Sequence, residues 1–391
     1  MVVMDYLAIT GRQEKLAQIE LETVFGLSNI TIISDFAVLI QVDKQPPQSK
    51  LGGAIKIGRV LATVEKADLA GAFKYLAAIM PEKLEELTDG KLKFGVSVYG
   101  FNPRPDWLLK NMLELKKVIR KQGRSVRIIQ NNTPELSSAQ VLYNKLTAEL
   151  GWELLLVKDG SDVIVAQTLS VQDIDAYAKR DHGRPARDAK VGMLPPKLAQ
   201  IMINLARPEK GSLVYDPFCG TGVVLQEAHL AGCKIAGNDL EPRMIDYTKQ
   251  NLTWLDEKLS DTPLTVADAK TVDLPDDIGA IVSEMFLGQP LFKPPANTHL
   301  DELLDENYDL LVSFLENIAK QTKTGTPLCV AIPAWSQSTG FTSVLNQKLS
   351  VDHLKKLGYN TQKFSYAKPE DLIYAREDQI VGRQLLVLRR N

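Results

Sequence analysis

Acidic residues and glycines at the ends of two neighbouring apolar segments are the part of this chain best suited to chemistry. The first segment ends at Asp216, and a turn follows that contains Gly220 and Gly222. The second segment ends at Asp239. Glycines let the backbone of such a turn approach a ligand closely, and an acidic residue at a strand tip can accept hydrogen bonds from two ribose hydroxyls. The stretch therefore predicts a nucleotide-binding strand–helix–strand unit.

The glycine spacing separates two classes of nucleotide ligand. A dinucleotide fingerprint has a third glycine where this chain has Leu225, and it places a pyrophosphate at the start of the helix. Asp216 precedes the turn, where its charge would repel a phosphate but favour an ammonium group. We therefore expect S-adenosylmethionine, with an ordinary strand-to-helix turn as the simpler alternative and a dehydrogenase as a remote one.

Each expected cofactor contact has a separate role. Asp216 and the turn would hold the methionine end, Asp239 the ribose, and Asp268 the adenine amino group. No metal is expected, because the three cysteines share no C-x-x-C spacing and the four histidines are scattered. The full set of expected cofactor-binding residues is Asp216, Pro217, Phe218, Gly220, Gly222, Asp239, Leu240, Asp268 and Ala269.

Length and composition indicate a globular protein of two or three domains. The chain has 391 residues, of which 45% are hydrophobic and 24% charged. The N-terminus lacks a basic region and is interrupted by Asp5, and no apolar run reaches the length of a membrane span. We therefore expect a cytoplasmic protein without a signal peptide or membrane segment.

The net charge of −2 conceals an asymmetry between the two halves. Residues 1–210 carry 29 Lys and Arg against 24 Asp and Glu, whereas the remainder carries 17 against 24. This pattern suggests that the front half meets an anionic partner. A solvated helix face is the simpler alternative for any one basic run. The expected RNA contacts are Lys117, Arg120 and Lys121 on a helix, and Arg180, Arg184 and Arg187 in a basic connector.

Apolar periodicity predicts alternating strands and helices throughout the chain, and hence an α/β fold. One predicted helix, Trp107–Lys121, would bury the stripe Leu108, Leu109, Met112, Leu113 and Ile119. Another is predicted at Ser137–Glu149. The second half is expected to form a doubly wound sheet with its site at the strand C-termini, followed by a terminal hairpin at Leu372–Arg376 and Ile380–Leu388.

Several motifs together resemble the THUMP-containing tRNA guanine-N2 methyltransferases, which modify the position-10 guanosine. The resemblance covers nearly the whole chain. It rests on Leu51-Gly-Gly-Ala-Ile-Lys-Ile, on 127–146 with Glu135-Leu-Ser-Ser-Ala, on Tyr177-Ala-Lys-Arg-Asp-His-Gly-Arg-Pro-Ala-Arg-Asp with Gly192-Met-Leu-Pro-Pro-Lys-Leu-Ala, and on Asp216-Pro-Phe-Cys-Gly-Thr-Gly.

The resemblance implies a domain order and a partner. It implies an N-terminal α/β subdomain (1–50), a ferredoxin-like and THUMP α+β module that binds RNA (51–170), a basic linker (171–192) and a Rossmann-like class I methyltransferase domain (193–391). The THUMP domain would grip the acceptor region of tRNA, and a guanine amino group would be methylated once or twice. The number of methylations, the oligomeric state and the need for a small activating protein partner stay open.

One departure from the family pattern falls on the expected catalytic residues. These enzymes carry D-P-P-Y or a close relative after the fourth strand, where this chain has Ser283-Glu284-Met285-Phe286. An exocyclic amine is a poor nucleophile, so an acceptor for its N–H groups and an aromatic ring against the flipped base are needed. Glu284 could be the acceptor and Phe286 the ring, but either Ser283 or Glu284 could occupy the acidic position.

The most favoured function is therefore transfer of a methyl group from S-adenosylmethionine to a guanine N2 amine in tRNA, with the base flipped into the pocket. Two alternatives stay open. The loss of both prolines, which normally shape a rigid turn, leaves open a catalytically inactive protein that binds S-adenosylmethionine and RNA. An amino methyltransferase acting on ribosomal RNA or DNA is the other.

Overall fold

The computed structural model describes residues 3–130, 132–188, 193–338 and 340–391, which divide into two compact units. The first unit holds residues 1–14, 25–49 and 54–174, and the second holds 15–24, 50–53 and 175–391. Part of the expected linker, including Lys190 and Gly192, lies outside the described residues. No described helix is long and apolar enough to cross a membrane.

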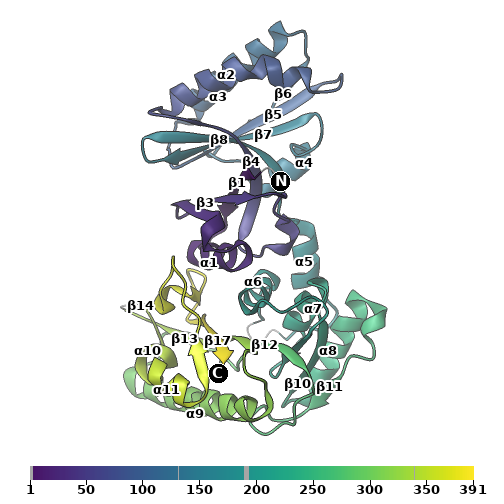
Figure 1. Cartoon of the computed structure of the whole chain (residues 1–391), viewed down its shortest axis with the longest axis vertical. Helices are drawn as coiled ribbons and strands as arrows, with labels where there is room; N and C mark the ends of the chain where they lie inside the picture. Colours follow the sequence, from purple (N-terminus) through teal and green to yellow (C-terminus); the bar gives the residue numbers. More distant parts are fainter. Residues whose placement is uncertain (1–2, 131, 189–192, 339) are drawn as a thin grey trace. The chain divides into compact units, whose positions relative to one another are not determined.

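The first unit is built on a sheet of eight strands in the order β2-β3-β1-β4-β8-β7-β5-β6 (Figure 1). Strands β5–β6 and β5–β7 pair in parallel, and the other neighbours are antiparallel. Its strands are β1 (Met4–Thr10), β2 (Ile30–Ser34), β3 (Ala37–Val42), β4 (Ala54–Val64), β5 (Leu92–Tyr99), β6 (Val126–Ile128), β7 (Gly151–Asp159) and β8 (Asp162–Val171). The expected division at residue 50 falls inside this sheet, because β1 pairs with both β3 and β4.

Two helices, α2 (Leu69–Glu85) and α3 (Pro105–Lys121), lie side by side over the sheet of the first unit (Figure 1). The predicted boundaries of α3 are nearly those observed, but its buried stripe is different. Leu115 is buried, whereas Leu113 is 43% exposed. The prediction for Leu113 rests on its apolar character. Apolar character alone does not show which way a helical side chain points, so this part of the prediction is wrong.

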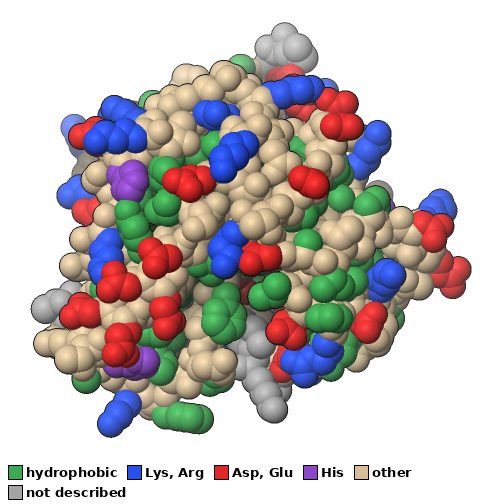
Figure 2. Space-filling view, turned by 90° about the horizontal axis from the view of Figure 1, so that it is seen from below, with side chains coloured by type: hydrophobic (Ala, Val, Ile, Leu, Met, Phe, Trp, Pro, Cys, Tyr) green, Lys and Arg blue, Asp and Glu red, His purple; other side chains and the backbone are tan. Residues whose placement is uncertain are grey.

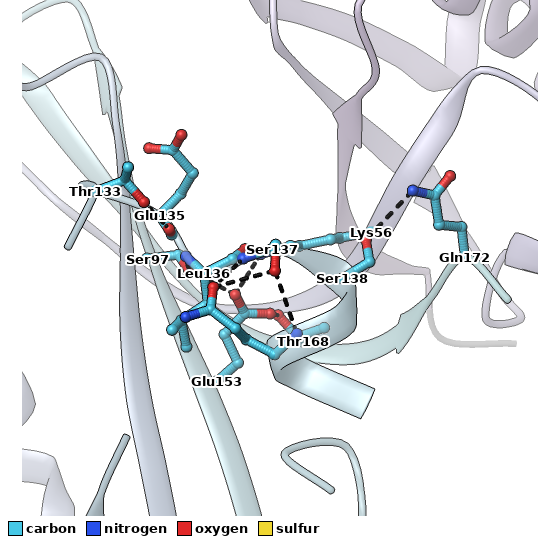
Figure 3. A network of polar contacts seen from close by, with 11 residues as sticks. Lys56, Ser97, Thr133, Glu135, Leu136, Ser137, Ser138, Glu153, Thr168 and Gln172 are labelled. Carbon is cyan, nitrogen blue, oxygen red and sulfur yellow. Dashed lines mark hydrogen bonds and ion pairs between the residues drawn. The ribbon is translucent and has the colours of Figure 1, made fainter. Parts of the chain in front are cut away.

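A buried polar network fixes the segment before α4 (Ser138–Asn144) against four strands (Figure 3). Lys56 pairs with Glu153 and donates to the carbonyl of Leu136 at 2.6 Å. Ser97 and Thr168 also donate to the carboxylate of Glu153, and Ser97 accepts from the Leu136 N–H at 2.9 Å. Burial lowers the pKa of Lys56, and the charge of Glu153 opposes that shift. The network explains why the Glu135–Ser138 segment is held in one place.

The predicted helix over Ser137–Glu149 is too long. Helix α4 begins after a capping box made by Ser137 and Gln140, and it ends at Asn144. Lys145 then adopts a left-handed conformation with φ of 57°, which interrupts the helical hydrogen bonds. The apolar periodicity of the sequence therefore continues beyond residue 145, whereas the helix does not.

The second unit is built on a doubly wound sheet in the order β11-β10-β9-β12-β13-β17-β15 (Figure 1). The first five strands are parallel and β17 is antiparallel to β13, so the expected α/β fold is confirmed. Its main strands are β9 (Leu213–Asp216), β10 (Lys234–Asp239), β11 (Leu264–Val266), β12 (Ile278–Glu284), β13 (Pro327–Gln337), β15 (Tyr359–Thr361) and β17 (Val381–Arg390). The order reverses between β9 and β12, where doubly wound sheets bind their ligands.

Short strands and helices complete the second unit. The expected terminal hairpin is present, because β16 (Ile373–Tyr374) pairs antiparallel with β17. A further short strand, β14 (Gly340–Ser343), pairs antiparallel with β13. Buried apolar clusters cover both faces of the sheet. The helices are α1 (Glu14–Phe25), most of which belongs to this unit, α5 (Ile174–His182), α6 (Pro196–Ala206), α7 (Val223–Leu230), α8 (Pro242–Leu255), α9 (Asn297–Gln321), α10 (Val344–Gln347) and α11 (Val351–Lys356).

The glycine pair in the Leu51-Gly-Gly-Ala-Ile-Lys-Ile motif has a packing role in the second unit. The buried carboxylate of Glu20 accepts from the N–H groups of Gly52 and Gly53, each at 2.8 Å, and from Asn204 at 2.7 Å. A Cβ on Gly52 would lie 2.3 Å from the Lys197 carbonyl oxygen. Burial raises the pKa of Glu20 to about 7, and these hydrogen bonds oppose that shift.

Candidate active site

The turn between β9 and α7 needs glycine for two separate reasons. Gly220 and Gly222 have φ angles of +52° and +82°, in the left-handed region that favours glycine. A Cβ on Gly222 would lie 3.0 Å from the Thr248 side chain, so a close approach of α8 adds a second constraint. Around Gly220 a Cβ would meet nothing nearer than 3.9 Å, and this side of the turn is open. The turn therefore leaves space where the sequence predicted a ligand.

Asp239, at the end of β10, fastens this turn to the neighbouring strand. One carboxylate oxygen accepts from the Gly220 N–H at 2.8 Å, and the other accepts from the Glu241 N–H at 3.0 Å. Burial raises the pKa of Asp239, and both backbone donors oppose that shift. The sequence predicted a ribose contact here but not the hydrogen bond to the turn.

Asn238, which sequence reasoning passed over, joins the ends of three strands. It accepts from the Tyr215 hydroxyl at 2.5 Å and donates to the carbonyls of Pro217 at 3.1 Å and Ala267 at 3.0 Å. The side chain is fully buried. An amide directly before the acidic strand tip was the signal that could have identified it.

The expected adenine-binding residues lie at the ends of β10 and β11. Asp268 is partly exposed and accepts from the Lys270 N–H at 2.9 Å, whereas Ala269 is buried. Leu240 is 64% exposed, and Val266, which pairs with Asp239 in the sheet, is 53% exposed. Exposed apolar side chains beside two carboxylates suit a flat ring that carries an amino group.

A cavity at the ends of β9 and β12 brings four of the predicted residues together: Asp216, Phe218, Gly220 and Glu284. Phe218 is held by an edge-to-face contact with Phe314, with ring centroids 5.3 Å apart. The other lining residues, which sequence reasoning did not select, are Asp188, Met193, Leu194, Cys219, Thr221, Val223, Val224 and Met244. The cavity does not include the predicted residues Pro217, Gly222, Asp239, Leu240, Asp268, Ala269, Ser283 and Phe286.

Ser283 and Glu284 have different environments, although either could occupy the acidic position by sequence. Ser283 is fully buried, and its hydroxyl donates to Asp216 at 2.5 Å. Glu284 lines the cavity, and its carboxylate forms an ion pair with Arg383. Phe286, two residues further on, is 52% exposed. The geometry thus places the carboxylate of Glu284, and not the hydroxyl of Ser283, in the cavity.

Burial shifts the pKa of two of the three carboxyl groups that line the cavity, those of Asp216 and Glu284. The pKa of Asp216 is raised to about 7, first by burial and then by the charges of Asp239 and Glu284, while hydrogen bonds from Ser283 and the Phe218 N–H oppose the shift. Burial also raises the pKa of Glu284, and Arg383 opposes that shift. The charge of Glu284 therefore adds to the rise in the pKa of Asp216, whereas Arg383 is the charge that acts on Glu284.

Arg383, the partner of the cavity-lining Glu284, is the main contact that the sequence did not reveal. It lies on β17, where it pairs with Pro333 of β13, and it is only 1% exposed. Its Nε donates to Glu284, which is 99 residues away in the chain. Nothing near Arg383 in the sequence indicates this contact.

The structure does not place all of the expected RNA-binding residues on the surface. Lys117, Arg120, Lys121 and Arg187 are exposed. Arg180 is 15% exposed and pairs with Glu227 at 2.6 Å, and Arg184 is only 2% exposed. Expecting Arg184 to track a phosphate backbone was therefore wrong, because its guanidinium is buried. On the face drawn in Figure 2, acidic and basic side chains are interspersed and form no continuous basic patch.

Part of the second unit matches a family model. Residues 184–333 match the family model described as RMKL-like, methyltransferase domain. This segment is a methyltransferase domain. The crystal structure of TrmN from Thermus thermophilus shares the fold, with a TM-score of 0.56 and 17% identity over 99% of this chain and 100% of that chain.

Two curated relatives of this chain carry the same name. A protein named tRNA (guanine(10)-N2)-dimethyltransferase from Methanothermobacter thermautotrophicus is 28% identical over 45% of this chain and 50% of its own length. Another of that name, from Methanocaldococcus jannaschii, is 43% identical over 22% of this chain and 25% of its own length. The matched part of this chain thus spans about half of the first relative's length and a quarter of the second's.

The methyltransferase domain fits S-adenosylmethionine as its cofactor. The buried carboxyl of Asp216 suits the ammonium group, and the open side of Gly220 leaves room for the methionine chain. The carboxylate of Asp239 and the exposed apolar pair Leu240 and Val266 suit a nucleoside. Among the described residues, no group of His, Cys, Asp and Glu has the arrangement of a metal site.

We expect Asp239→Ala to weaken binding of S-adenosylmethionine by on the order of 2–3 kcal/mol, because a charged acceptor is lost. The turn at Gly220 also loses its anchor, which adds to the effect. Isothermal titration calorimetry measures the loss. Asp268→Ala is the matched control and should lose less, since a single amino contact is at stake. Unchanged affinity of the Asp239→Ala variant would remove Asp239 from the cofactor site.

Proposed function

We propose that this protein methylates the exocyclic N2 amine of a guanosine in tRNA, with the base flipped into the cavity. The observation that carries the proposal is the position of Glu284. Its carboxylate lies at the end of β12 and lines the same cavity as Asp216 and Gly220, so an acceptor for an amine stands beside the expected cofactor site. The name shared by the curated relatives supports the choice of tRNA and of guanine N2.

Bound S-adenosylmethionine supplies an electrophilic methyl group, and the residues of this chain position the amine. Glu284 accepts an N–H of the guanine amine, which draws electron density toward the nitrogen. Asp216 and the Gly220 turn would hold the cofactor so that the nitrogen lone pair takes its methyl group, and the electrons of the broken S–C bond would stay on sulfur. The proton released from nitrogen passes to Glu284 and then to water. Phe286, half exposed beside the cavity, stacks on the flipped base.

Nucleoside mass spectrometry tests the proposal directly. The purified chain is incubated with unmodified tRNA and S-adenosylmethionine carrying a labelled methyl group. We expect labelled N2-methylguanosine or its dimethylated form. A labelled adenosine, or product only on ribosomal RNA or DNA, would contradict the proposed substrate.

The ion pair of Arg383 and Glu284, together with the missing prolines, favours one second candidate, a protein that binds S-adenosylmethionine and tRNA without turnover. The same experiment separates the two. Calorimetric binding of cofactor without methylated product, across a full tRNA pool and with candidate activating proteins added, would support the inactive protein.

We propose that the exposed basic end of α3 contacts tRNA. Replacing Lys117, Arg120 and Lys121 with glutamine should weaken tRNA binding and flatten its salt dependence, by up to about 0.9 units of log–log slope for each lost phosphate contact. Lys117 also pairs with Glu114, but that exposed pair contributes little to stability. Filter binding at several salt concentrations measures both quantities.

A matched triple variant at the exposed residues Lys44, Lys66 and Lys74 removes the same charge elsewhere in the first unit. Binding of S-adenosylmethionine should be unchanged in both variants. Equal losses of tRNA affinity would mean that only net charge matters, and unchanged affinity of the α3 variant would make this end of the helix a solvated face.

A further inference from the structure

A buried arginine beside the cofactor cavity forms no ion pair with any residue that the structure describes. Arg184 is 2% exposed, although it belongs to the basic connector. One of its terminal nitrogens lies 3.4 Å from the Thr221 hydroxyl and the other lies 3.4 Å from the Met193 sulfur. Its Nε has no hydrogen-bond partner within the part of the chain that the structure describes.

Two acidic side chains near the connector, Glu227 and Asp188, pair with other arginines. Glu227 accepts from Arg180 at 2.6 Å, and Asp188 accepts from Arg243 at 2.8 Å. Burial lowers the pKa of Arg184, and the nearby charge of Arg187 adds to that shift. The charges of Asp181 and Glu227 oppose it without a direct ion pair among the described residues. An arginine nevertheless keeps its proton inside a protein. A buried guanidinium that makes no direct ion pair is costly unless an anion joins it.

The position of Arg184 indicates which anion would pair with its guanidinium. Thr221 and Met193, its two contacts, both line the cavity that also contains Asp216. The charged side chains lining the described cavity are Asp188, Asp216 and Glu284, all of them acidic. An α-amino acid group needs an anion for its ammonium and a cation for its carboxylate. Asp216 supplies the anion for the ammonium group, and the described residues that line the cavity include no cation for the carboxylate.

We propose that Arg184 binds the carboxylate of the methionine end of S-adenosylmethionine, while Asp216 binds its ammonium group. The inference rests on the proposed cofactor, and it gives the buried guanidinium the anion that its surroundings lack. It also gives the connector a role in the site, because Arg184 brings this segment against Thr221 of the cofactor turn.

The test compares S-adenosylmethionine with its decarboxylated form, which keeps the ammonium group and the sulfonium but lacks the carboxylate. Calorimetry on the full chain should show the wild type binding S-adenosylmethionine at least about tenfold more tightly, and Arg184→Met should lose about 10- to 100-fold for S-adenosylmethionine alone. Affinity for the decarboxylated ligand should change less than about twofold, because no charge pair is lost with it.

Arg187→Met is the matched control, since Arg187 is exposed in the same connector and should affect neither ligand. Equal losses for both ligands in Arg184→Met would overturn the inference and leave Arg184 a packing role. Equal affinities of the wild type for both ligands would overturn it too, even if the variant does not fold. In both cases the proposed function survives. A wild type that binds neither ligand would remove the proposed cofactor and the inference together.

Discussion

Replacing Glu284 with glutamine should lower the rate of methyl transfer about 10²–10⁴-fold, which is the range for loss of a positioned proton acceptor. Glutamine has nearly the same shape, but its amide cannot take the proton that leaves the guanine amine. Binding of S-adenosylmethionine and of tRNA should be largely retained. Single-turnover transfer of labelled methyl to unmodified tRNA, with enzyme in excess, measures the chemical step apart from product release.

Phe286→Ala is the comparison that separates proton transfer from base positioning. It removes stacking on the flipped base worth roughly 1–3 kcal/mol, so its loss should be smaller than that of Glu284→Gln and should be accompanied by weaker tRNA binding. Equal single-turnover rates in the wild type and Glu284→Gln would move the acceptor role to Ser283 or to the backbone.

The cofactor turn could be predicted from sequence because its determinants are local. Gly220 and Gly222 follow a strand within a few residues, and their positive φ angles are a backbone requirement that the sequence displays. Asp239 likewise stands at the tip of the next strand, where the parallel pairing of β9 and β10 brings it to the turn. Alternation of strands and helices then sufficed to predict the doubly wound sheet.

The environment of Glu284 could not be predicted, because it depends on the order of strands in the sheet. Strand β17 lies next to β13, and β13 lies next to β12, so Arg383 comes near Glu284 only after the last strand has been inserted. The basic connector that contains Arg184 and Arg187 likewise could not be interpreted from sequence alone. Its basic residues look alike in sequence, yet Arg187 is exposed and Arg184 is buried, because burial depends on what packs against each one.

The second large effect is expected for Arg383→Met, and it should appear in the pH dependence of methyl transfer. Arg383 lowers the pKa of Glu284 against the opposing effect of burial. Without the guanidinium, burial acts alone, and the pKa of Glu284 rises further. The ionised carboxylate is the form that accepts the proton, so the acid limb of the rate profile should move to higher pH. Activity on the acid side of the wild-type profile should therefore be lost, and it should be partly recovered as the pH is raised.

A purely structural role for Arg383 would give a different result. Breaking a buried ion pair by removing one partner costs about 3–5 kcal/mol, so a lower melting temperature is expected in either case. Only a positioning role moves the acid limb, and Arg383→Lys, which keeps the charge, should move it less. Arg389→Met is the matched control on β17, because Arg389 is exposed and donates to the Gly325 carbonyl. An acid limb that stays in place in Arg383→Met, with cofactor binding intact, would mean that Glu284 does not depend on Arg383 for its ionisation.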